Sequence, residues 1–183
     1  TAHELTKFIN RLLTPLSEII MTNRGTIDKY MGDAIMAFWN APLDDADHAT
    51  HALRSALDMM RRMDGLNEEW AREAAAAGKE HSRVAIGIGI NSGACCVGNL
   101  GSSQRFDYSA IGDDVNVASR YEGLSKVYGV PIVVGEQTLK LMEGVTAVEL
   151  DLMRVKGRAH PTRIYTPAEA IDPARTVQAV GYD

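Results

Sequence analysis

The sequence predicts an α+β fold. Apolar residues recur at helical spacing in several long stretches, and short runs of β-branched and aromatic residues punctuated by glycine lie between them. The predicted order is helix, hairpin, helix, hairpin, helix, strand, helix, strand, strand, with the helices packed on one sheet. A helix that opens a chain and leads into an inner hairpin usually follows a strand in a split βαβ unit. We therefore expect this chain to lack the first strand of its fold.

The first half of the chain carries the clearest signals. Residues 2–23 form an amphipathic helix, because their apolar side chains recur every three or four positions. Residues 26–31 and 34–39 form a β-hairpin, since Gly32 between them supplies the positive φ of a tight turn. A second helix is predicted over residues 46–63, and residues 68–77 continue it or form a separate helical piece.

The second half is predicted as shorter elements. Residues 84–91 form a buried strand that turns at Ser92-Gly93 into residues 94–97, which makes a second hairpin, and residues 98–103 form a loop. The remaining strands and helices are expected over residues 105–110, 114–128, 131–134, 136–142, 145–155 and 163–169.

Composition limits the possible functions. The 183 residues suit one domain, which we place at residues 1–170 and expect to be incomplete at its N-terminus, followed by a tail at 171–183. A net charge of −5 argues against nucleic acid as a partner. The adjacent Cys95 and Cys96 give neither a disulfide framework nor a metal-type spacing. With no membrane-span-length apolar run and no signal peptide, we expect a cytoplasmic domain, whose parent protein could carry an anchor elsewhere.

Several motifs together point to a family. They are the segment around Gly32-Asp33, residues 87–93 with 97–101, residues 106–120, and residues 154–158. In this order and spacing they resemble the class III nucleotidyl cyclase catalytic domain of the bacterial adenylate cyclase type, over most of residues 4–167. The resemblance implies a ferredoxin-like βαββαβ sandwich and conversion of ATP to 3′,5′-cyclic AMP and pyrophosphate. It also implies an upstream sensor or membrane domain in the parent protein.

The resemblance assigns roles to the polar residues of these motifs. Asp33 matches one of two aspartates that bind two Mg²⁺ or Mn²⁺ ions per site. Asn116 matches the residue that orients the ribose, and Arg120 the one that stabilises the pentavalent phosphorus. They are spaced i and i+4, so a helix presents both on one face. Lys156 matches the lysine that binds the outgoing phosphates.

Base choice is assigned to two further residues. Lys29, four residues before Asp33, matches the purine-reading lysine of adenylate cyclases, and Ser109 matches its partner. A lysine donates to the adenine N1 edge, while a serine hydroxyl donates or accepts at the exocyclic amine. Guanylate cyclases usually carry Glu and Cys there, so we expect ATP to be preferred over GTP.

The resemblance also implies a homodimer. In the family one subunit provides the metal aspartates, here Asp33, and the other provides the remaining site residues, so two composite sites form. The family's other metal aspartate precedes the first helix, upstream of this sequence, so the chain alone holds half a metal site and would be nearly inactive. The alternatives are a guanylate cyclase, which Lys29 argues against, or a catalytically inactive cyclase-like module that dimerises or binds nucleotide.

Overall fold

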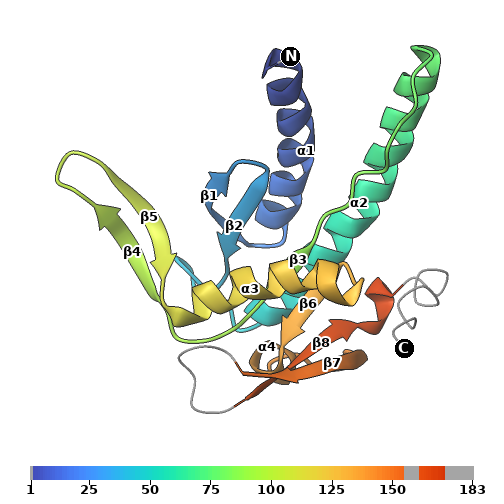
Figure 1. Ribbon diagram of the computed structural model, residues 1–183. Coiled ribbons are helices and arrows are strands. Elements are labelled where there is room, and N and C mark those ends of the chain that lie inside the picture. The colour runs from blue at the N-terminus through green and yellow to red at the C-terminus, as the bar shows by residue number, and fades with distance from the viewer. Residues whose placement is uncertain (1, 155–160, 172–183) are drawn as a thin grey trace.

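The computed structural model of the chain describes residues 2–154 and 161–171 and sets two long helices beside several short strands (Figure 1). The first half contains α1 (Ala2–Thr22), β1 (Thr26–Met31), β2 (Ala34–Phe38) and α2 (His48–Ala76). The second half contains β3 (Ile88–Ile90), β4 (Cys96–Gly101), β5 (Phe106–Ile111), α3 (Asp113–Tyr128), β6 (Ile132–Gly135), α4 (Glu136–Lys140), β7 (Ala147–Met153), β8 (Thr162–Pro167) and a 3-10 turn, Ala168–Ala170. The predicted α+β class is confirmed.

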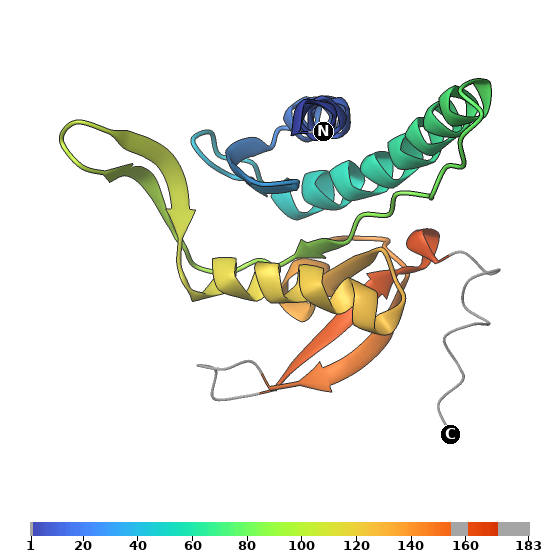
Figure 2. The same cartoon turned by 45° about the horizontal axis from the view of Figure 1, so that its top comes forward.

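The strands that the structure describes form three hydrogen-bonded groups, so the prediction of a single sheet was wrong. β1 pairs with β2, β4 pairs with β5, and the central sheet has the order β3-β6-β8-β7. Within the central sheet β3 runs parallel to β6, and the other neighbours are antiparallel. The β4–β5 ribbon projects away from the rest of the fold, so it does not extend the central sheet (Figures 1 and 2).

The core is built on β6, whose four residues are all buried. Alternate side chains of a strand point to opposite faces of its sheet, so one strand can pack against two helices. Ile132 and Val134 belong to a cluster with the first part of α2, and Val133 to a cluster with Val117 and Tyr121 of α3. The central sheet therefore has a helix on each face, and α3 is held in a fixed place.

The two long helices pack on each other through a third cluster. Its buried members are Leu12, Leu16 and Ile20 of α1 with Met59, Met63, Leu66 and Trp70 of α2. Each such buried side chain contributes about 1.5–3 kcal/mol relative to an exposed one. No helix within residues 2–154 and 161–171 is long and apolar enough to cross a membrane.

α2 is one continuous helix of 29 residues, whereas the sequence allowed either one helix or two separate pieces. Residues 46–63 and 68–77 are joined because Gly65 is tolerated inside the helix, at a cost of about 1 kcal/mol relative to alanine. Leu66 and Trp70 beyond it continue the buried stripe against α1 and offset that cost.

The predicted second hairpin was wrong. Residues 84–91 contain only the short β3, which pairs with β6, while β4 pairs with β5. The glycines of this segment serve close packing on α3. A Cβ atom at Gly89 would lie 2.2 Å from the Glu122 nitrogen and 2.3 Å from the Ala118 oxygen. Glycine here therefore allows β3 to lie directly against a helix.

The other predicted elements are confirmed, with ends within two residues of those expected. One exception is the loop predicted over residues 98–103, because β4 continues through Gly101. The reversal is confined to a turn in which the Ser102 N–H donates to the Arg105 carbonyl at 2.8 Å. The tail predicted at 171–183 lies, beyond residue 171, outside the described residues.

A buried carboxylate, Asp45, organises the turn before α2. Its Oδ2 lies 2.7 Å from Nδ1 of His51, and its Oδ1 lies 3.8 Å from the Arg24 guanidinium. The Asp47 N–H donates to Oδ1 at 3.2 Å. Burial alone would raise the pKa of the Asp45 carboxyl, but the His51 hydrogen bond and the attraction to His51 and Arg24 outweigh it, so the pKa is lowered. The ionised carboxylate therefore stabilises the folded chain.

We expect Asp45→Asn to lower the free energy of unfolding by about 1–3 kcal/mol at pH 7, since buried donors lose a charged acceptor. A carboxyl whose pKa falls on folding stabilises above its unfolded pKa, and this contribution is lost as pH drops through the lower folded value. The difference in the free energy of unfolding between the parent and Asp45→Asn, measured in urea, should therefore shrink below about pH 4. Asp44→Asn, at an exposed neighbouring position, is the matched control. Equal stabilities of Asp45→Asn and the parent at pH 7 would contradict this role.

Candidate active site

The β1–β2 hairpin carries two of the predicted site residues. Gly32 has φ +64° and opens the turn, and the exposed Asp33 completes it. Lys29 lies in β1 with 47% of its side chain exposed.

A β-bulge in β1 falls at Asp28. The register passes from Ile27 opposite Ala37 to Lys29 opposite Met36, so Asp28 has no partner on β2. Bulges of this kind redirect a side chain and are frequent next to active sites. Here the bulge turns the Asp28 carboxylate toward β5.

The Asp28 carboxylate is fully buried and joins β1 to β5. The Ser109 Oγ donates to it, at 2.7 Å from Oδ2 and 2.9 Å from Oδ1, and the Ala110 N–H donates to Oδ2 at 2.8 Å. The Lys29 ammonium lies 3.3 Å from Oδ1. The two predicted base-reading residues, which are 80 positions apart in sequence, are thus brought to one carboxylate.

α3 presents the other two predicted residues that the structure describes. Val117 and Tyr121 are buried against the central sheet, and the residues directly before each of them, Asn116 and Arg120, are exposed. The start of α3 is fixed by Asn91, whose Nδ2 donates to the Asp114 carbonyl at 3.0 Å and to its Oδ1 at 2.9 Å. Asn116 and Arg120 therefore lie on one accessible face of a firmly packed helix.

Residues 1–166 match the model of the adenylate and guanylate cyclase catalytic domain family. The chain belongs to this family. The predicted family is confirmed.

Known cyclases agree in sequence and in fold. The chain is 33% identical to adenylate cyclase 1 of Rhizobium meliloti over 96% of its length, and 36% identical to an adenylate cyclase of Anabaena cylindrica over 88%. It spans only 26% and 32% of the length of these two relatives. The crystal structure of the adenylyl cyclase CyaB from P. aeruginosa superposes with a TM-score of 0.80 at 32% identity, covering 92% of this chain and 84% of that one.

The cyclase domain thus distributes the predicted residues over three elements. Lys29 and Ser109 meet at Asp28, Asp33 stands at the hairpin turn, and Asn116 with Arg120 stands on α3. α3 packs on β3 and β6, while the hairpin packs on α1 and β5. Lys156 lies outside the described residues.

The family generally uses divalent metal ions, and Asp33 is the predicted ligand in this cyclase domain. Within the part of the chain that the structure describes, no three His, Cys, Asp or Glu side chains gather as a metal site. A single exposed carboxylate still fits the donor set of Mg²⁺ in nucleotide enzymes, which uses one or two carboxylates together with substrate phosphates. Asp33 could therefore supply one protein ligand of such a site.

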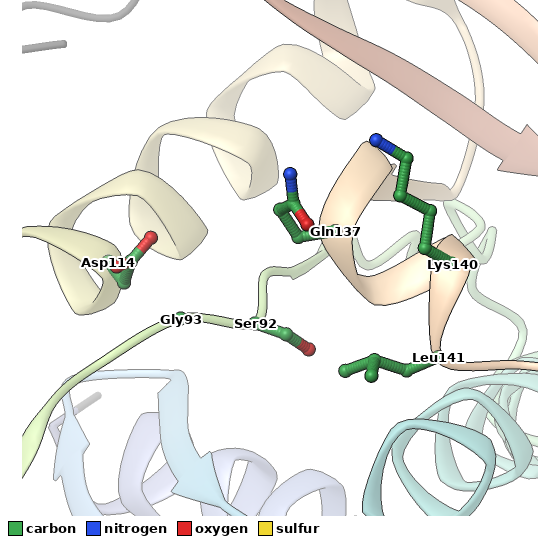
Figure 3. Close-up of a pocket in the computed structure, with 6 residues that line it drawn as sticks. All are labelled: Ser92, Gly93, Asp114, Gln137, Lys140 and Leu141. Carbon is green, nitrogen blue, oxygen red and sulfur yellow. The ribbon is translucent and has the colours of Figure 1, made fainter.

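A surface hollow of the cyclase domain lies between α3 and α4 (Figure 3). It has a volume of about 390 Å³, with Asp114 of α3 on one side and Gln137 and Lys140 of α4 on the other. None of the predicted site residues that the structure describes lines it.

Asp28 was missed from the sequence. A carboxylate beside a lysine within a strand is usually a solvent-exposed charge, whereas the side chain of Asp28 is fully buried. Its hydrogen-bond partners are 81 and 82 residues away, and the bulge that redirects it leaves no mark in the local pattern. The one available signal was its place between Ile27 and Lys29, inside the motif that carries the family resemblance.

Proposed function

We propose that the chain is the catalytic domain of an adenylate cyclase, which converts ATP to 3′,5′-cyclic AMP and pyrophosphate. The observation that carries this proposal is the pairing of Lys29 and Ser109 at the Asp28 carboxylate. An ammonium donor next to a hydroxyl suits the N1 and N6 edge of adenine. Relatives that are named adenylate cyclases support the choice of ATP over GTP.

The reaction is an in-line displacement at the α-phosphorus. The ribose 3′-hydroxyl loses its proton and forms a bond to this phosphorus, and the bond to the pyrophosphate oxygen breaks. Such a reaction depends on positioning and on stabilisation of developing charge. Asn116 would orient the ribose and Arg120 would neutralise charge on the phosphorus, while Lys156 would bind the departing phosphates. Divalent ions, Mg²⁺ or Mn²⁺, held in part by Asp33, would supply positive charge to the phosphates and the attacking oxygen.

The proposed active form is a homodimer with two shared sites. Apolar side chains are exposed on β1 and β5, next to the predicted site: Tyr30, Met31, Phe106, Tyr108 and Ile111. Exposed apolar surface that gathers in one region marks interaction sites. A second copy of the chain that covers this surface would bring its own Asp33 or α3 to the site.

The assignment of Lys29 and Ser109 to base recognition is tested by exchanging the hydrogen-bond donors and acceptors that they present. Lys29→Glu with Ser109→Cys replaces the residues expected for ATP with those expected for GTP. We expect the ratio of kcat/KM for ATP to that for GTP to fall at least about a hundredfold, because two polar contacts to the base are mismatched. Lys29→Glu also removes the ion pair with Asp28, so thermal unfolding is measured alongside. A folded double variant with unchanged selectivity would remove both residues from the base site.

A further inference from the structure

We infer that Asp28 sets the purine selectivity of this domain as a positioning residue. It turns the Ser109 hydroxyl so that only oxygen lone pairs face a bound base, and it holds the Lys29 ammonium beside that oxygen. The inference rests on the proposed function, since it concerns the same site, and it assigns a role to a residue that would not itself contact the nucleotide.

The geometry leaves the Ser109 hydroxyl one direction for its hydrogen. A carboxylate only accepts hydrogen bonds, and both Asp28 oxygens lie within 2.9 Å of the Ser109 Oγ. Ser109 is 2% exposed, so there is little room for another orientation. A base that contacts Ser109 must do so through the small part of this residue that is left uncovered.

This orientation distinguishes the two purines. A serine hydroxyl has one hydrogen and two lone pairs, and the hydrogen is used on Asp28. Toward a base, Ser109 is therefore an acceptor and Lys29 a donor. Adenine presents an N6 amine donor next to its N1 acceptor, which matches both. Guanine presents an O6 acceptor next to an N1–H donor, so both contacts would be mismatched, and polar groups left without a partner weaken binding.

Asp28 also braces β5 against β1, through the Ala110 N–H as well as through Ser109. A brace alone would affect ATP and GTP alike, because it acts on the position of the strands. An effect on the orientation of the Ser109 hydroxyl would change the ratio of kcat/KM for ATP to that for GTP. The ratio is therefore the decisive quantity.

Asp28→Asn keeps the shape of the side chain and replaces one acceptor oxygen with an NH₂ donor. If the amide oxygen keeps the Ala110 N–H, the NH₂ group faces Ser109 and donates to it. Because the Ser109 Oγ then accepts from that NH₂ group, its hydrogen is no longer fixed by two acceptor oxygens and can also turn toward the base, where it suits guanine O6. We expect the ratio of kcat/KM for ATP to that for GTP to fall about tenfold or more. The ratio of affinities, measured by displacement of a fluorescent ATP analogue, should fall with it and needs no turnover.

The double variant Asp28→Asn with Ser109→Ala isolates the proposed route. If Asp28 acts through the Ser109 hydroxyl, Asp28→Asn should change the ratio little in the Ser109→Ala background, a non-additive result. Asp44→Asn, the same change at an exposed position, should leave the ratio unchanged. An unchanged ratio in a folded Asp28→Asn protein, or an equal change with and without Ser109, would overturn the inference. Failure of the parent protein to form a cyclic nucleotide or bind ATP would instead contradict the proposed function, and the inference with it.

Discussion

Replacing Arg120 by alanine should lower kcat about 100- to 1,000-fold while the KM for ATP changes less than about threefold. Arg120 is exposed on α3, whose buried neighbours Val117 and Tyr121 fix the helix against the central sheet. A guanidinium held by a rigid helix is suited to charge that develops at the phosphorus, and an interaction made only in the transition state affects kcat.

The measurement is steady-state cyclic AMP formation over a range of ATP concentrations. Arg72→Ala is the matched control, because Arg72 is exposed on α2 and lies far along the chain from the predicted site residues. Its kcat should equal that of the parent protein. If Arg120→Ala instead raises KM and leaves kcat unchanged, Arg120 binds the ground state, contrary to the proposed role.

Much of the fold could be predicted because its signals are local. The helical stripe of α1, the Gly32 turn and the i, i+4 pair on α3 each lie within one continuous stretch. The errors arose where tertiary packing decides. Residues 84–91 and 94–97 were expected to pair with each other, but β3 pairs with β6, and Gly89 lets it lie against the backbone of α3. Likewise α2 continues through Gly65, since the residues beyond it pack on α1.

The candidate site was predictable only in part. Physical reasoning places Asn116 and Arg120 on one helix face, and the family resemblance supplies the roles of these two residues and of Lys29, Ser109 and Asp33. These roles remain predictions. Neither route could identify Asp28, because its burial depends on a bulge in β1 and on partners from β5. The orientation of the Ser109 hydroxyl, open to either donor or acceptor in the sequence, follows only from that contact.

Mixing two inactive variants tests the central claim most directly, namely an adenylate cyclase whose sites are shared between two subunits. Asp33 on the hairpin turn and Arg120 on α3 belong to elements that pack on different parts of the fold. If Asp33 of one subunit and Arg120 of the other serve one site, a mixed dimer of Asp33→Ala and Arg120→Ala has one site with both changes and one with neither. In an equal mixture half of the dimers are mixed, so activity should recover to about a quarter of the parent value per subunit.

The control is a mixture of Arg120→Ala with Asn116→Ala, two variants on the same helix face. Each site of that mixed dimer carries one of the changes, so no activity should return. The readout is cyclic AMP formed from ATP with Mg²⁺ or Mn²⁺ by the protein that carries this chain, after subunit exchange has been verified. The account predicts recovery of cyclic AMP formation in the first mixture and none in the second. No recovery in the first mixture, with both variants folded and exchanging subunits, would contradict it.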